Sequence, residues 1–97
     1  MKKLIIINDY FRSPEGNLIV SGIFENSCYS LSKENVKALS GKRIIITKPN
    51  GEMLKTNIKS ADMATSLSNL ITLAIELPIN YHEKDIPRNS ILFINEK

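Results

Sequence analysis

Apolar residues in this chain occur in short runs, and a turn sequence follows nearly every run. The longest unbroken runs, Leu4–Ile7 and Ile91–Ile94, have four residues each, and isoleucine supplies 15 of the 97 residues. Short β-branched runs bounded by Gly, Pro, Asn and Ser are typical of strands, whereas an amphipathic helix needs ten or more residues with a period of 3.6. The sequence therefore predicts an all-β fold.

Alternation of apolar and polar residues predicts six or seven strands, of which six have clear bounds, at 3–7, 17–25, 43–48, 52–59, 70–77 and 90–95. Ser32–Gly41 is the only helical candidate, because Ser32 can cap a helix, Val36 and Leu39 lie one turn apart, and Gly41 can end it. Asn80–Arg88 is expected to be a polar connection. Strands at this spacing are typical of a small barrel or sandwich, and 97 residues leave room for one domain, residues 1–97.

The register of one hairpin can be predicted from its turn, Pro49-Asn50-Gly51. A two-residue Asn-Gly loop would pair Ile46 with Lys55 and mix the two faces. A three-residue loop with Gly51 in the left-handed region pairs Ile46 with Leu54, so that apolar residues mostly meet apolar residues. We therefore expect the three-residue loop. Its outward face then carries Arg43, Ile45, Thr47, Met53, Lys55, Asn57 and Lys59.

The same alternation predicts which side chains fill the core. The residues expected to be buried are Ile7, Val20, Phe24, Ile44, Ile46, Ile58, Ile71, Leu73, Ile75 and Leu92. Core packing is also the favoured role of Phe11 and Phe93, and it is favoured over ligand binding for Tyr10 and Tyr29. Gly22, in the middle of a strand, indicates a bulge or a bend.

The residues that carry chemistry in enzymes are few and scattered. A single cysteine, Cys28, excludes an internal disulfide and a multi-cysteine zinc site, and neither a pairing of Cys28 with His82 nor a metal site at His82–Asp85 has further support. Asp9, Asp62 and Glu76 form no recognisable carboxylate pair. We expect a non-enzyme without cofactor, metal or nucleotide. The apolar runs are too short for a signal or membrane segment, so a cytoplasmic location is expected.

Five motifs in order resemble the second domain of translational GTPases such as elongation factor Tu. They are Ile6–Phe11 with the glycine turn at Gly16, Val20–Glu25, Leu39–Ile46, Ile58–Met63 and Asp85–Leu92. The resemblance implies a six-stranded Greek-key β-barrel, and it aligns Asp62 with the family's acidic residue near the aminoacyl end. The chain departs from the family in a short inserted segment at Ser27–Asn35, so that the expected fold is this barrel with one short helical insertion. No G-x-x-x-x-G-K-[ST] motif is present, so nucleotide hydrolysis is not expected.

Charge is uneven along the chain. The formal net charge is +3, yet Lys33–Lys59 contains seven basic and two acidic residues. A solvated basic face without function is the favoured interpretation of that bias alone. Taken with the resemblance, it leads to the hypothesis of a non-catalytic module that binds RNA or a translation component. Arg43, Lys55 and Lys59 would contact phosphates, Lys42 and Lys48 would flank them, and Asp62 is a further candidate. The alternative is a protein-binding role, as an immunity or inhibitor protein or an accessory subunit.

Overall fold

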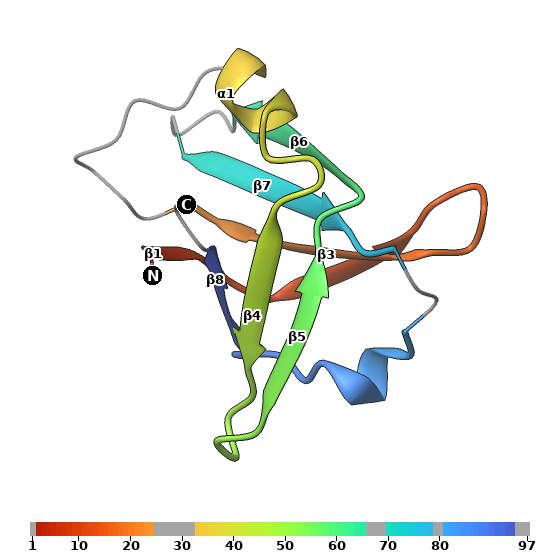
Figure 1. The fold of residues 1–97 in the computed structure, drawn as a ribbon, viewed down its shortest axis with the longest axis vertical. Coiled ribbons are helices and arrows are strands. Elements are labelled where there is room, and N and C mark those ends of the chain that lie inside the picture. Colours follow the sequence, from red (N-terminus) through yellow and green to blue (C-terminus); the bar gives the residue numbers. More distant parts are fainter. Residues whose placement is uncertain (1, 25–32, 66–69, 79–80, 95–97) are drawn as a thin grey trace.

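The computed structural model describes residues 2–24, 33–65, 70–78 and 81–94, which form two four-stranded antiparallel sheets. Sheet A has the order β1 (Lys2–Ile6), β8 (Ile91–Ile94), β4 (Arg43–Thr47) and β5 (Met53–Asn57). Sheet B has the order β2 (Asp9–Arg12), β3 (Leu18–Ile23), β7 (Ile71–Glu76) and β6 (Ser60–Thr65). A short helix, α1 (Lys33–Lys37), lies against β6, and a 3₁₀ turn, η1 (Glu83–Asp85), precedes β8 (Figure 1).

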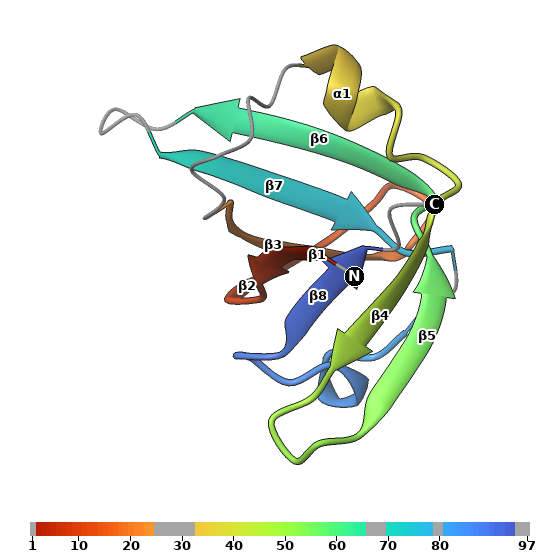
Figure 2. The ribbon, with the colours of Figure 1, turned by 60° about the vertical axis from the view of Figure 1, so that its left-hand side comes forward.

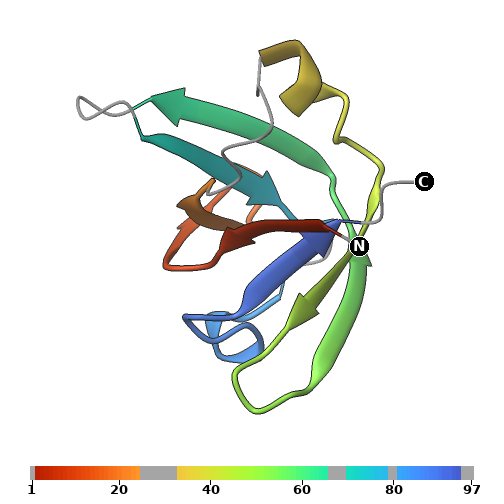
Figure 3. The same cartoon turned by 90° about the vertical axis from the view of Figure 1, so that its left-hand side faces the viewer.

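The chain bends from one sheet into the other at two corners. At the first, Ile7 N–H donates to the Ser90 carbonyl on the side of sheet A, and Asn8 N–H donates to the Ser21 carbonyl in sheet B. At the second, Ile58 N–H donates to the Lys42 carbonyl, and Lys59 N–H donates to the Glu76 carbonyl. Figures 2 and 3 show β5 continuing into β6 at the side where the two sheets meet.

The predicted all-β fold is confirmed, and the corners explain why the strand number differs. The expected strand 3–7 continues past its corner as β2, and the expected strand 52–59 continues as β6. Asp62, which the resemblance aligns with an acidic residue near the aminoacyl end, lies in the middle of β6. With eight strands in two sheets, the six-stranded Greek-key barrel is not established.

Side chains from the inner faces of both sheets form one core. Eight of the ten expected core residues are buried: Ile7, Val20, Ile44, Ile46, Ile58, Leu73, Ile75 and Leu92. Phe24 and Ile71 are only partly buried, because they lie at strand ends. Core packing was a wrong prediction for Phe11, which is 53% exposed. Tyr10, its neighbour in β2, pairs with Val20 and takes the inward position.

The predicted hairpin register is confirmed. Ile46 pairs with Leu54 and Ile44 with Thr56, and Gly51 has a φ of +93°. Lys48 N–H donates to the Glu52 carbonyl, which leaves Pro49–Gly51 as the three-residue loop. Gly51 is required there because a side chain is strained in the left-handed region. The outward positions of β4 and β5 are therefore those that the sequence predicted.

The helical candidate forms a single short helix. Val36 is buried, and Gly41, with a φ of +85°, donates its N–H to the Ile58 carbonyl and so ties the end of this segment to the second corner. Most of the expected insertion, from Ser27 to Ser32, lies outside the described residues.

The connection at 80–88, which was expected to be polar, contains one apolar side chain that the sequence did not indicate as buried. Ile86, directly after η1, is fully buried. Among the described residues, no helix has the length and apolar character required to cross a membrane.

Gly22→Ala is expected to destabilise the fold strongly. Gly22 lies where β3 passes β1, and an added Cβ would collide with the Ile6 carbonyl group. Since this neighbour is backbone, the collision requires β1 to shift, at a cost of about 1–3 kcal/mol for overpacking. Urea denaturation followed by circular dichroism measures the loss. If the Gly22→Ala variant unfolds at the same urea concentration as the wild type, β1 is free to move and the close approach of Gly22 to Ile6 is contradicted.

Candidate functional site

Charged residues are segregated between the two sheets. The strands of sheet A contain four basic residues and no acidic residue: Lys2, Lys3, Arg43 and Lys55. The strands of sheet B contain three acidic residues and one basic residue: Asp9, Asp62, Glu76 and Arg12. The strands of sheet A therefore carry a net positive charge, and those of sheet B carry a net negative charge.

The outward side of β4, β5 and β8 combines positive charge with apolar side chains. We call this surface the basic face; it consists of Arg43, Ile45, Thr47, Met53, Lys55, Asn57, Ile91 and Phe93. Arg43 and Lys55 are exposed, and Met53 is 65% exposed. Phe93 pairs with Ile45, which pairs with Lys55, so an aromatic ring, an aliphatic side chain and a cation follow one another across three strands.

Two of the lysines predicted to bind a ligand are held by carboxylates instead. Lys48 Nζ lies 3.9 Å from Glu52 Oε2 beside the hairpin loop. Lys59 Nζ lies 3.5 Å from Glu15 Oε2 and 3.6 Å from Glu76 Oε2. Lys59 also lies beyond the second corner, where its backbone bonds to sheet B. The structure therefore brings Arg43 and Lys55 together on neighbouring strands but separates Lys59 from them.

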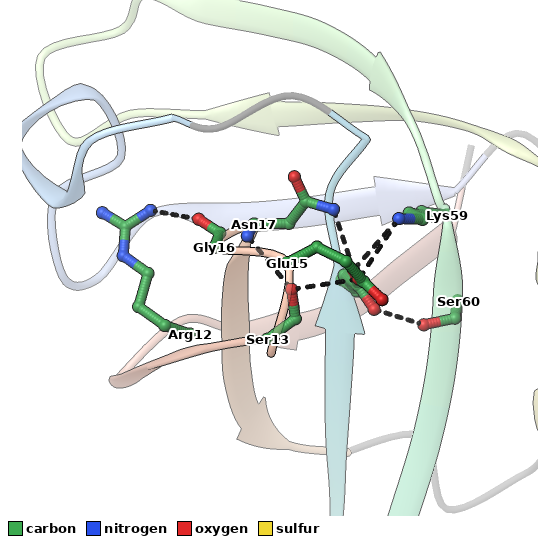
Figure 4. Close-up of polar contacts among 8 residues, drawn as sticks. Arg12, Ser13, Glu15, Gly16, Asn17, Lys59 and Ser60 are labelled. Carbon is green, nitrogen blue, oxygen red and sulfur yellow. Dashed lines mark hydrogen bonds and ion pairs between the residues drawn. The ribbon is translucent and has the colours of Figure 1, made fainter.

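The carboxylate of Glu76 is the centre of a polar cluster at the second corner. Figure 4 labels Asn17, Lys59 and Ser60, whose polar atoms converge there. Asn17 Nδ2 donates to Oε2 at 3.0 Å, and Ser60 Oγ donates to Oε1 at 3.0 Å. The hydrogen bond from Asn17 lowers the pKa of Glu76 below its ordinary value of 4.5, and Ser60 and the Lys59 charge act in the same direction against the opposing effect of burial. These contacts join the β2–β3 turn, the second corner and the end of β7, so the cluster is structural.

Asp62 lies in sheet B, away from the basic face. It lines a hollow of about 560 Å³ between α1 and β6, together with Val36, Lys37, Ser60, Ala61 and Met63. Its Oδ1 accepts a hydrogen bond of 2.9 Å from the backbone N–H of Met63. The structure therefore does not join Asp62 to the predicted cationic residues.

The remaining candidates have structural positions or lie outside the described residues. Tyr10 donates its hydroxyl to the Ile86 carbonyl, and the Arg88 guanidinium lies 6.0 Å from its ring centroid. His82 caps η1, with Nδ1 accepting from Lys84 N–H at 3.2 Å. Cys28 and Tyr29 are outside the described residues. Within the part of the chain that the structure describes, no three His, Cys, Asp or Glu side chains are grouped to hold a metal ion.

Sequence reasoning missed one member of the basic face. Phe93 was expected in the core together with Leu92, but neighbouring residues of a strand face opposite sides. Leu92 is fully buried, so Phe93 belongs to the outward row. Strict alternation of inward and outward side chains along 90–95 would have placed Phe93 on the outward side.

Comparison of the chain with models of protein families, with curated proteins and with solved structures found no match. The resemblance to translational GTPases therefore stays a prediction that rests on the five motifs.

Glu76→Gln is expected to lower the free energy of unfolding at pH 7 by about 1 kcal/mol, because a charged hydrogen-bond acceptor is lost. The lowered pKa means that this contribution is complete above pH 4.5 and disappears as the pH falls further and wild-type Glu76 is protonated. Thermal melts of both proteins between pH 7 and pH 3 measure the difference. Glu52→Gln, which removes an exposed ion pair, is the control and should have a smaller effect. A Glu76→Gln deficit that stays constant with pH would contradict this assignment.

Proposed function

We propose that the protein is a non-catalytic module that binds RNA through the basic face. Arg43 and Lys55 would contact phosphates, the first as a planar fork and the second as a point charge. The side chains of Phe93, Ile45 and Met53 would lie against bases or sugars. Among the cations predicted to contact a ligand, these two alone combine exposure with a position on the basic face.

One observation carries this proposal. Arg43 and Lys55 are exposed on adjacent strands, and neither forms an ion pair or side-chain hydrogen bond with another residue of the described ranges. Lys48 and Lys59, by contrast, have carboxylate partners within 4 Å. A cation without a protein partner gives up only water when it binds a phosphate, whereas a paired lysine must first break its ion pair. The available charge therefore lies beside the apolar side chains of sheet A.

A barrel of the translation-factor type belongs to the same proposal. If β1 with β2, and β5 with β6, are each counted as one bent strand, the eight strands become six. The bridge between Ile5 and Phe24 supports this count, because it links β1 of sheet A to the end of β3 in sheet B. On this interpretation the basic face is one side of the barrel wall.

Replacing Arg43 and Lys55 together by Ala is expected to weaken RNA binding and its salt dependence. Each lost phosphate contact removes about 0.7 from the slope of log affinity against log salt for single strands, so the double variant should lose about 1.4. Fluorescence anisotropy with a labelled ten-nucleotide oligouridylate, titrated at several salt concentrations, measures the RNA affinity and its salt dependence. The fold should be retained, since exposed charges contribute about 0–1 kcal/mol to stability.

Lys37→Ala combined with Lys84→Ala is the matched control. It removes the same net charge from exposed positions outside sheet A and should leave the affinity nearly unchanged. An equal loss in both double variants would indicate attraction by net charge alone and would contradict a site at the basic face. A wild-type protein without salt-sensitive RNA affinity that instead holds a protein partner would favour the inhibitor alternative.

A further inference from the structure

Among the described residues, the outer edge of β5 differs from the edges of β2 and β6 in having no cover. β5 forms the margin of sheet A in Figures 1 and 2, and it packs chiefly on β4. An uncovered edge strand presents a row of backbone donors and acceptors that another extended chain can bind. The hydrogen bonds of the hairpin determine which backbone N–H and C=O groups of β5 point outward from the sheet.

The hydrogen bonds at the two ends of the hairpin fix its pattern. Lys48 N–H donates to the Glu52 carbonyl, and Ile58 N–H donates to the Lys42 carbonyl. Bonded and non-bonded pairs alternate in an antiparallel ladder, so the even-numbered residues of β5 bond to β4. The backbone groups of Met53, Lys55 and Asn57 therefore point away from β4. None of these three N–H groups has a partner within the described ranges.

Two other edges of the sheets have specific protection. At the edge of β6, α1 lies alongside the strand, and the side chain of Asp62 accepts the N–H of Met63. At the edge of β2, Tyr10 donates to the Ile86 carbonyl, and Arg12 Nη1 donates to the Tyr81 carbonyl at 3.0 Å. These contacts place other parts of the chain beside β6 and β2. At β5 no comparable contact is present among the described residues.

The side chains of β5 indicate which extended chain fits. Met53 and Lys55 are exposed on the outward side, and Leu54 is only partly buried on the inward side. A second copy that paired all three free residues would place Lys55 opposite Lys55, and like charges directly opposite are unfavourable. The strands of sheet A contain no acidic residue to neutralise this lysine. The complementary chain is therefore acidic on one face and apolar on the other.

We propose that the edge of β5 binds an extended acidic segment of a partner protein, which adds to sheet A as a fifth strand. The segment exchanges backbone hydrogen bonds with Met53, Lys55 and Asn57. Its acidic side chains lie beside Lys55, and its apolar side chains cover Leu54. This is strand addition, in which the backbone supplies affinity and alternate side chains supply specificity.

A capped seven-residue peptide of alternating valine and glutamate tests the proposal, with a valine–lysine peptide as its control. Amide hydrogen exchange followed by NMR reports on each backbone N–H. The glutamate peptide at saturation should slow exchange at Met53, Lys55 and Asn57 by at least about tenfold, because these amides become hydrogen-bonded. The valine–lysine peptide should leave the exchange rates of these three amides unchanged. Lys55→Glu should reverse the preference between the two peptides.

Arg43→Ala separates this proposal from RNA binding. Its substitution lies on β4 and removes a cation of the basic face, so it should weaken RNA binding while the glutamate peptide still protects the β5 amides. Absence of protection with the glutamate peptide, or equal protection with both peptides, would overturn strand addition at β5 without touching the RNA proposal. Concentration-dependent protection of the same amides in the protein alone would overturn it in favour of pairing between copies.

Discussion

Burial of Ile7 and Ile58 at the two corners is the constraint on which the rest of the structure depends. Both side chains are almost completely buried, and each stands where one strand leaves sheet A and enters sheet B. The backbone bonds to a different sheet on either side of each corner, so the strand bends without losing its hydrogen bonds. This arrangement lets one core serve both sheets in a chain of only 97 residues.

The second corner also decides which lysines remain available. Because the chain turns at Ile58, Lys59 leaves the outward row of β5 and meets Glu15 and Glu76. Sequence spacing alone placed Lys59 two positions after Asn57 on the same face as Lys55. The charge that remains on the basic face is therefore smaller than the sequence suggests, but it belongs to residues without carboxylate partners in the described ranges.

The success and failure of prediction from the sequence have a common physical cause. Local alternation and turn chemistry determined the hairpin register and most of the core, since Gly51 fixes the loop and Ile44 and Ile46 fix the inward face. The corners depend on contacts between distant segments, such as those of Ile58 with Lys42 and of Lys59 with Glu76. No local pattern marks those contacts. The sequence accordingly predicted one strand over 52–59, whereas the chain forms β5 up to Asn57 and a second strand, β6, from Ser60.

Lys55 links the two binding proposals, because its side chain lies on the basic face while its backbone lies on the open edge. An acidic strand added to β5 would place carboxylates beside Lys55 and would reduce the positive potential that the RNA proposal requires. RNA bound across Lys55 would in turn shield the charge that attracts the acidic strand. The two ligands would therefore oppose each other through one side chain, and the strength of that opposition depends on how much of each affinity Lys55 contributes. A protein partner at this edge would then act as a regulator of RNA binding rather than as a second, independent ligand.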